Sequence, residues 1–192
     1  MERKLDIGCG QHPREGFEGA DLYAPGALHK IDFFKFPWPF ADDTFDELYC
    51  SHFVEHIPAR EVEPRDLAPG GLAFGYEGCD MFFAFFDECY RILKPGGIMK
   101  VIVPFGRSAR GFQDPTHRRF LMAETFGYLS REWRKVNGLD HYRVECHFAS
   151  DIVPTVGEEM NLMSPERAGT MMAHYWNVIH DLHVTLKSGK VL

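Results

Sequence analysis

At 192 residues, the chain is long enough to bury one sizeable hydrophobic core and too short for two ordinary domains. Hydrophobic residues make up 45% of the chain and aromatic residues 14%, which argues against an intrinsically disordered protein. The net charge of −7 argues against a broad nucleic-acid-binding face, and the longest apolar run, residues 81–86, is too short to span a membrane.

In the first third of the chain, short apolar segments that end at turn residues predict four strands. They are expected at residues 4–7, 17–23, 29–34 and 45–51. One or two turns of helix should follow at 52–57, where Pro58 ends them. Residues 59–78 are rich in glycine and proline, which predicts a loop insertion.

In the remaining chain, apolar residues at helical spacing predict a helix at 80–94, with Asp80 as its N-cap. A strand buried on both faces should follow at 98–103, and a helix at 125–135. Alternating patterns predict half-buried strands at 142–148 and 178–187. Together these elements predict a doubly wound, mainly parallel α/β sheet with an antiparallel edge.

We found neither a secretion signal after Met1 nor a linker, and the five cysteines contain no C-x-x-C pair. We therefore expect one cytoplasmic domain over residues 1–192, with reduced thiols.

Glycines and acids follow the first three predicted strands. Gly8 and Gly10 end the first, where a backbone without β-carbons can approach an anionic or zwitterionic ligand, and Asp6 can hold an ammonium group. Asp21 ends the second strand, where a carboxylate can accept hydrogen bonds from ribose hydroxyls. Asp32 follows in the third and can accept a bond from an adenine amino group. Only ten residues separate Gly10 from Asp21, so the first crossover should be shortened. This order favours a nucleoside site.

Five segments in this order resemble the class I S-adenosylmethionine (SAM)-dependent methyltransferases, especially the small type-11-like group. They are residues 5–10 (LDIGCG), 20–22 (ADL), 36–48 (FPWPFADDTFDEL), 51–56 (SHFVEH) and 88–97 (ECYRILKPGG). The matching region covers about the first 105 residues, interrupted by the insertion at 59–78. The resemblance implies the Rossmann-like methyltransferase fold, with SAM as the cofactor and S-adenosylhomocysteine as the product.

The resemblance also assigns roles to individual residues. It implies that the methionine part of SAM is held by Asp6, Gly8 and Gly10. Asp21 would bind the ribose, and Asp32 with Phe33 the adenine. Ser51 and His52 would line the site near the methyl group. A segment at 113–120 resembles one found after the fifth strand of some small bacterial and phage-like methyltransferases.

Methyl transfer needs a general base only if the acceptor is protonated. Asp114 and His117 follow the fifth predicted strand, at 98–103, and they are our candidate catalytic residues. Residues 107–135 carry about four more basic than acidic side chains, which favours an anionic small-molecule or carrier-linked acceptor. A solvated helix face is the simpler explanation of that charge. Motifs for methylation of nucleic-acid bases are missing, and no membrane partner is expected.

Two other functions stay open. A SAM- or nucleotide-binding module without catalysis would carry the same glycine turn and acids. Alternatively, His52, Glu55 and His56 fit the H-x-x-E-H pattern of zinc metallopeptidases, in which two histidines one helical turn apart bind the metal. Pro58 shortens any such helix, and the pattern leaves the glycine turn unexplained, so no metal ligand is assigned.

Overall fold

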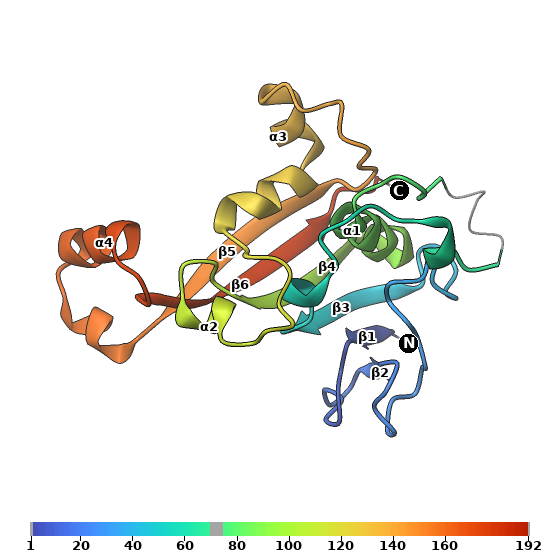
Figure 1. Ribbon diagram of the computed structural model, residues 1–192, viewed down its shortest axis with the longest axis horizontal. Helices are drawn as coiled ribbons and strands as arrows, with labels where there is room; N and C mark the ends of the chain where they lie inside the picture. Colours follow the sequence, from blue (N-terminus) through green and yellow to red (C-terminus); the bar gives the residue numbers. More distant parts are fainter. Residues whose placement is uncertain (1, 70–74, 192) are drawn as a thin grey trace.

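The computed structural model describes residues 2–69 and 75–191, and its central feature is one mixed sheet of six strands in the order β2-β1-β3-β4-β6-β5 (Figure 1). The strands are β1 (Lys4–Ile7), β2 (Glu18–Ala20), β3 (Phe45–Ser51), β4 (Leu93–Pro104), β5 (Phe148–Val156) and β6 (Ile179–Ser188). The first four pair in parallel, whereas β6 is antiparallel to both β4 and β5. The mainly parallel α/β sheet with an antiparallel edge is confirmed.

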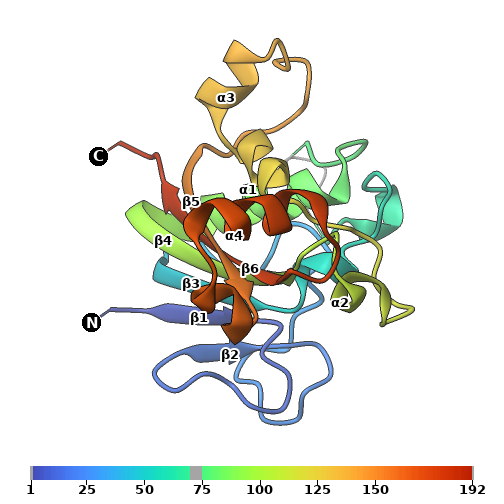
Figure 2. The ribbon, with the colours of Figure 1, turned by 90° about the vertical axis from the view of Figure 1, so that its left-hand side faces the viewer.

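Most of the helices are short. The α-helices are α1 (Met81–Ile92), α2 (Ala109–Phe112), α3 (Arg131–Val136) and α4 (Pro165–His174). Of the described helices, only α1 and α4 have ten residues or more. The 3₁₀ helices are η1 (Val54–His56), η2 (Pro64–Asp66), η4 (Ala123–Leu129) and η5 (Glu158–Leu162). In Figures 1 and 2, α4 lies beyond the ends of β5 and β6. Across the described residues, each helix is too short or too polar to traverse a lipid bilayer.

Helix α1 packs on the apolar face of the sheet. Leu5, Leu48 and Met99 stand in register on β1, β3 and β4, and all three are fully buried. The same core includes Phe85 and Phe86 of α1. Asp80 caps the helix by accepting a hydrogen bond from the backbone N–H of Phe82 at 2.8 Å, as predicted. Burial of these aromatic and aliphatic side chains therefore fixes α1 against the strands whose ends form the candidate site.

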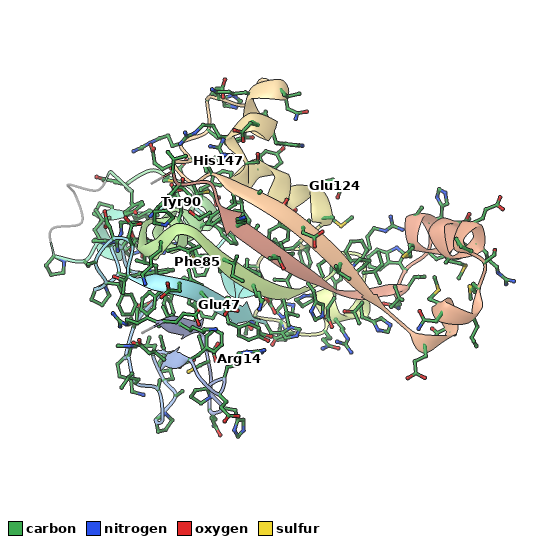
Figure 3. The ribbon with its side chains drawn as sticks, turned by 180° about the vertical axis from the view of Figure 1, so that it is seen from behind. Arg14, Glu47, Phe85, Tyr90, Glu124 and His147 are labelled. Atoms are coloured by element: carbon green, nitrogen blue, oxygen red, sulfur yellow. The ribbon has the colours of Figure 1, made fainter. Side chains whose placement is uncertain are left out.

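On the opposite face, the connection from β1 to β2 replaces a crossover helix. It contains no helix, so the shortened first crossover is confirmed. Arg14 from this connection lies over the ring of Tyr49, at 4.4 Å from its centroid. Farther along this face, Glu47 pairs with both Lys4 and Lys100. Figure 3 labels Arg14 and Glu47, which mark this polar side of the sheet.

Two of the segments that carried the methyltransferase resemblance bind each other. Glu88 on α1 is fully buried and accepts hydrogen bonds from the backbone N–H of Trp38 and the hydroxyl of Tyr76, both at 2.6 Å. Arg91 donates to both carboxylate oxygens of Glu88 at 2.6 and 2.8 Å and to the carbonyls of Trp38 and Phe40. This Glu88–Arg91 clasp ties the irregular aromatic segment at 36–42 to helix α1.

Several predicted elements differ from the structure. The strand predicted at 29–34 is wrong: only a single bridge from Ala20 to His29 forms there. The chain then turns at Asp32, which accepts hydrogen bonds from the backbone N–H of Phe34 and of Lys35. The strand predicted at 17–23 is confirmed only for Glu18–Ala20. Within the insertion predicted at 59–78, residues 70–74 lie outside the described residues, and the described part includes η2.

The strand predicted at 142–148 is also wrong, because side chains take up its backbone groups. The carboxylate of Asp87 accepts the N–H groups of Glu145 and Cys146, and the guanidinium of Arg134 donates to the carbonyls of Val144 and Cys146. The edge strand β5 begins only at Phe148. The helix predicted at 125–135 is split into η4 and α3 at Ser130, whose hydroxyl caps α3. Neither the full length of β5 nor α4 was predicted.

Asp87 should make stability depend on pH. Burial raises the pKa of its carboxyl from 3.8 to about 6, although the two backbone N–H groups lower it. The folded state therefore holds a proton that the unfolded state releases between about pH 4 and pH 6. This contribution is complete below pH 4 and is lost as the pH rises through 6. Wild type should lose about 2–3 kcal/mol relative to Asp87→Asn between pH 4 and pH 7.

Urea unfolding of the two proteins at several pH values measures this difference, with Asp151→Asn on the exposed edge strand as the control. A gap between Asp87→Asn and wild type that stays constant with pH would contradict the prediction.

Candidate functional site

The turn after β1 uses its backbone groups to bind the neighbouring strand. Gly8 and Gly10 both adopt positive φ angles, +68° and +57°, which explains the need for glycine. The N–H groups of Gly8 and Cys9 donate to the carbonyl of Ala20 at 2.9 and 3.2 Å. Asp6 is nearly fully buried and accepts the N–H of Arg14 at 2.8 Å. Burial raises the pKa of Asp6, and the Arg14 N–H partly opposes that rise.

Asp21 connects this turn with the loop after β2. One carboxylate oxygen accepts the N–H of Gly10 at 3.1 Å, and the other accepts those of Tyr23 and Ala24 at 2.7 and 2.8 Å. Burial disfavours the charged form, but these backbone donors outweigh it and lower the pKa of Asp21. The structure thus brings two of the predicted site residues, Gly10 and Asp21, into direct contact.

Phe53 lies between the glycine turn and the segment predicted to hold adenine. A β-carbon on Gly8 would lie 2.4 Å from Cδ2 of Phe53, so the phenyl ring packs directly on the glycine. The same ring contacts Phe33 edge-on at 5.7 Å and stacks on Phe34 at 5.5 Å between centroids. Phe33 itself is buried in the core. Gly8 and Phe33 therefore converge on one aromatic side chain that sequence reasoning did not single out.

The end of β3 carries the next predicted pair, Ser51 and His52. His52 has a φ of +52°, which is uncommon for a residue with a side chain and typical of functional sites. Its Nδ1 lies 3.4 Å from Oε1 of Glu55, and this carboxylate raises the pKa of His52. Only the three residues Val54–His56 are helical, so His52 and His56 do not share a helix as the peptidase pattern requires.

A cavity of about 410 Å³ lies beside the carboxyl ends of β3 and β4. Its lining includes His52, Glu55, His56, Asp114 and His117. The structure thus brings both predicted catalytic residues, Asp114 and His117, to the same cavity as His52. Parallel α/β sheets bind ligands at this edge, outside the carboxyl ends of their strands.

A second cavity, of about 600 Å³, lies near the beginning of α1 and has basic and aromatic side chains in its lining. Arg118 and Arg119 both line it. Arg119 is held by the carbonyls of Ile57 and Pro58 and by Asp80, so its role is partly structural. Arg134, another basic residue of 107–135, is buried and donates its hydrogen bonds to backbone carbonyls. Arg118 also donates to backbone carbonyls, those of Pro115 and His117, but it is exposed and has no acidic partner among the described residues. It is therefore the better candidate for contact with an anion.

No protein-family model and no curated protein sequence matches this chain. Solved structures do match along nearly its whole length. A SAM-dependent methyltransferase from Archaeoglobus fulgidus has a TM-score of 0.59 at 20% identity, with 97% of this chain and 86% of that chain covered.

Two further structures each have a TM-score of 0.52. One is a SAM-dependent methyltransferase from Thermotoga maritima, described as a possible histamine N-methyltransferase, at 15% identity with 98% and 83% coverage. The other is the [4+2]-cyclase SpnF, at 18% identity with 97% and 74% coverage. The strand order, the glycine turn and these similarities together show that the chain has the class I SAM-dependent methyltransferase fold.

Proposed function

We propose that this protein is a SAM-dependent methyltransferase. The observation that carries the proposal is the link from Gly10 to Asp21 at the carboxyl edge of a sheet with this fold. A carboxylate has about four lone-pair sites, and Asp21 uses three of them on backbone N–H groups. One site is left for a ribose hydroxyl, and Phe34 and Phe53 supply aromatic surface for an adenine ring.

SAM would supply an activated methyl group on a sulfonium, so the protein mainly has to align the acceptor in a site protected from water. The cavity that contains His52 and His117 supports such a role, because it opens where β3 and β4 end. The other cofactor contacts inferred from the sequence stay predictions: those of Asp6, Gly8, Asp32, Phe33, Ser51 and His52.

Calorimetric titration with SAM and S-adenosylhomocysteine tests the proposal. Both should bind with micromolar dissociation constants. Asp21→Asn should weaken both by about 10–100-fold, since it removes charge-assisted hydrogen bonds from the ribose and from Gly10. Asp151→Asn on the exposed edge strand is the matched control and should bind as wild type does. Failure of wild type to bind either nucleoside would refute the proposal.

We further propose that the acceptor is an anionic small molecule or a carrier-linked sugar that contacts Arg118 in the 600 Å³ cavity. The release of S-adenosylhomocysteine in the presence of phosphorylated or carboxylated acceptors measures methyl transfer to such acceptors. Arg118→Gln should raise the KM for the acceptor far more than the Kd for SAM. Equal effects on both would contradict it. Nucleoside binding without turnover on any acceptor would instead favour a non-catalytic SAM-binding module.

A further inference from the structure

Glu55 is a buried carboxylate in an unusual environment. It is 1% exposed and lines the 410 Å³ cavity. Within the part of the chain that the structure describes, no donor makes a hydrogen bond to either of its side-chain oxygens. The imidazoles of His52 and His117 come within 3.4 and 4.0 Å of Oε1. A buried carboxylate whose two oxygens accept no hydrogen bond is costly even with a histidine nearby, which points to a positive ligand at this place.

His117 is oriented so that its second nitrogen faces Glu55. Its Nδ1 lies 2.8 Å from the carbonyl oxygen of Gly111. A carbonyl only accepts, so Nδ1 carries a proton, and in the neutral imidazole Nε2 then carries the lone pair. That Nε2 is the atom 4.0 Å from Oε1 of Glu55. In this neutral form two accepting groups face each other, and a cation between them would satisfy both.

His56 is held in the same way by two residues of the segment that also carries His117. The hydroxyl of Thr116 donates to Oδ1 of Asp114 at 2.7 Å. Its oxygen then accepts from Nδ1 of His56, 3.0 Å away, which leaves the lone pair of His56 on Nε2. Metal-binding histidines typically donate their second N–H to an oxygen in this manner. Asp114 therefore acts as a positioning residue for His56 through Thr116.

We propose that Glu55, His56 and His117 bind a divalent transition-metal ion, with Zn²⁺ as the best match. Their ligand atoms lie within 4.8 Å of one another. Zinc sites with an open position use three protein ligands of this kind, at about 2.0–2.2 Å, so the side chains would close in by about 1 Å. All three residues line the 410 Å³ cavity, through which a fourth ligand could enter. This set differs from the peptidase pattern, in which His52 and His56 bind the metal, because Glu55 and His117 are ligands here and His52 is not. The site does not depend on the proposed methyl transfer.

Metal titration of tag-free protein, stripped with a chelator, tests this site. Calorimetry with ZnCl₂ should give one ion per chain, and Co²⁺ should produce the visible absorption of a tetrahedral complex. Glu55→Gln and His117→Ala should each lower zinc affinity at least tenfold. Thr116→Val keeps all three ligands and should lower it by about tenfold or more through loss of His56 orientation. His183→Ala, an exposed histidine on β6, is the control and should leave affinity unchanged.

Equal zinc affinity of wild type, Glu55→Gln and Thr116→Val would overturn the proposal, as would wild-type protein that binds no zinc. Circular dichroism of each stripped variant shows whether it is folded. If His117→Ala does not fold, the zinc affinity of Thr116→Val tests the proposal instead, because this variant removes neither a ligand nor a buried charge. The SAM titration of the same stripped protein separates this result from a failure of the proposed function.

Discussion

Replacing Glu88 with glutamine is expected to lower the free energy of unfolding by about 3–5 kcal/mol, the range for breaking a buried ion pair. Glu88 is fully buried, and its two oxygens accept four hydrogen bonds from Trp38, Tyr76 and Arg91. Glutamine keeps the shape of the side chain but presents an N–H₂ group where one oxygen accepted. It also removes the negative charge that faces the Arg91 guanidinium in a region protected from water.

Asp42→Asn is the matched control, because Asp42 is a second acidic partner of the same arginine. Its side chain is 70% exposed, and such surface pairs contribute about 0–1 kcal/mol. Urea unfolding followed by tryptophan fluorescence, to which buried Trp38 contributes, measures both variants. Similar losses for Glu88→Gln and Asp42→Asn would show that the Glu88–Arg91 clasp does not support the fold.

Gly8→Ala is expected to cost about 2–5 kcal/mol, whereas Gly10→Ala should cost about 1–2 kcal/mol. Both glycines have positive φ, so both variants strain the backbone. They differ in surroundings. A β-carbon on Gly8 would meet Phe53 at 2.4 Å, but one on Gly10 would have nothing within 4 Å.

A double-mutant cycle isolates this contact. In a Phe53→Ala background the cost of Gly8→Ala should fall by about 1–3 kcal/mol, toward that of Gly10→Ala. Denaturant unfolding of the four proteins gives the coupling free energy. If the two substitutions are additive, Phe53 is not packed on the glycine turn.

Regular, strongly patterned elements were predictable because local sequence decided them. The buried strands at 4–7 and 45–51 and the capped helix after Asp80 agree with the structure. The pattern at 142–148 failed, although it alternates well, because Asp87 and Arg134 lie elsewhere in the sequence and capture its backbone groups. Alternation reports which side chains are buried, and it cannot reveal side chains from other elements that replace a strand partner.

The candidate site was predictable in part for the same reason. Glycines and acids at strand ends identified the turn at 8–10 and Asp21, which the structure joins through a hydrogen bond. The role of Phe53 was hidden because its contact with Gly8 depends on the parallel pairing of β1 with β3. The approach of His117 to Glu55 joins residues far apart in the chain, and no local pattern indicates it. The sequence did point to the segment Asp114-Pro115-Thr116-His117 as part of the site. It did not indicate that this segment would lie against Glu55.

The order of the strands has a consequence for synthesis on the ribosome. β6 follows both β4 and β5 in the sequence, but it lies between them and pairs with both. During translation, β4 and β5 therefore leave the exit tunnel before the strand that joins them. Until β6 arrives, each exposes unpaired backbone groups that can associate with other chains. Because the joining strand is translated after both of its partners, the nascent protein has open strand edges at risk of aggregation until that strand emerges.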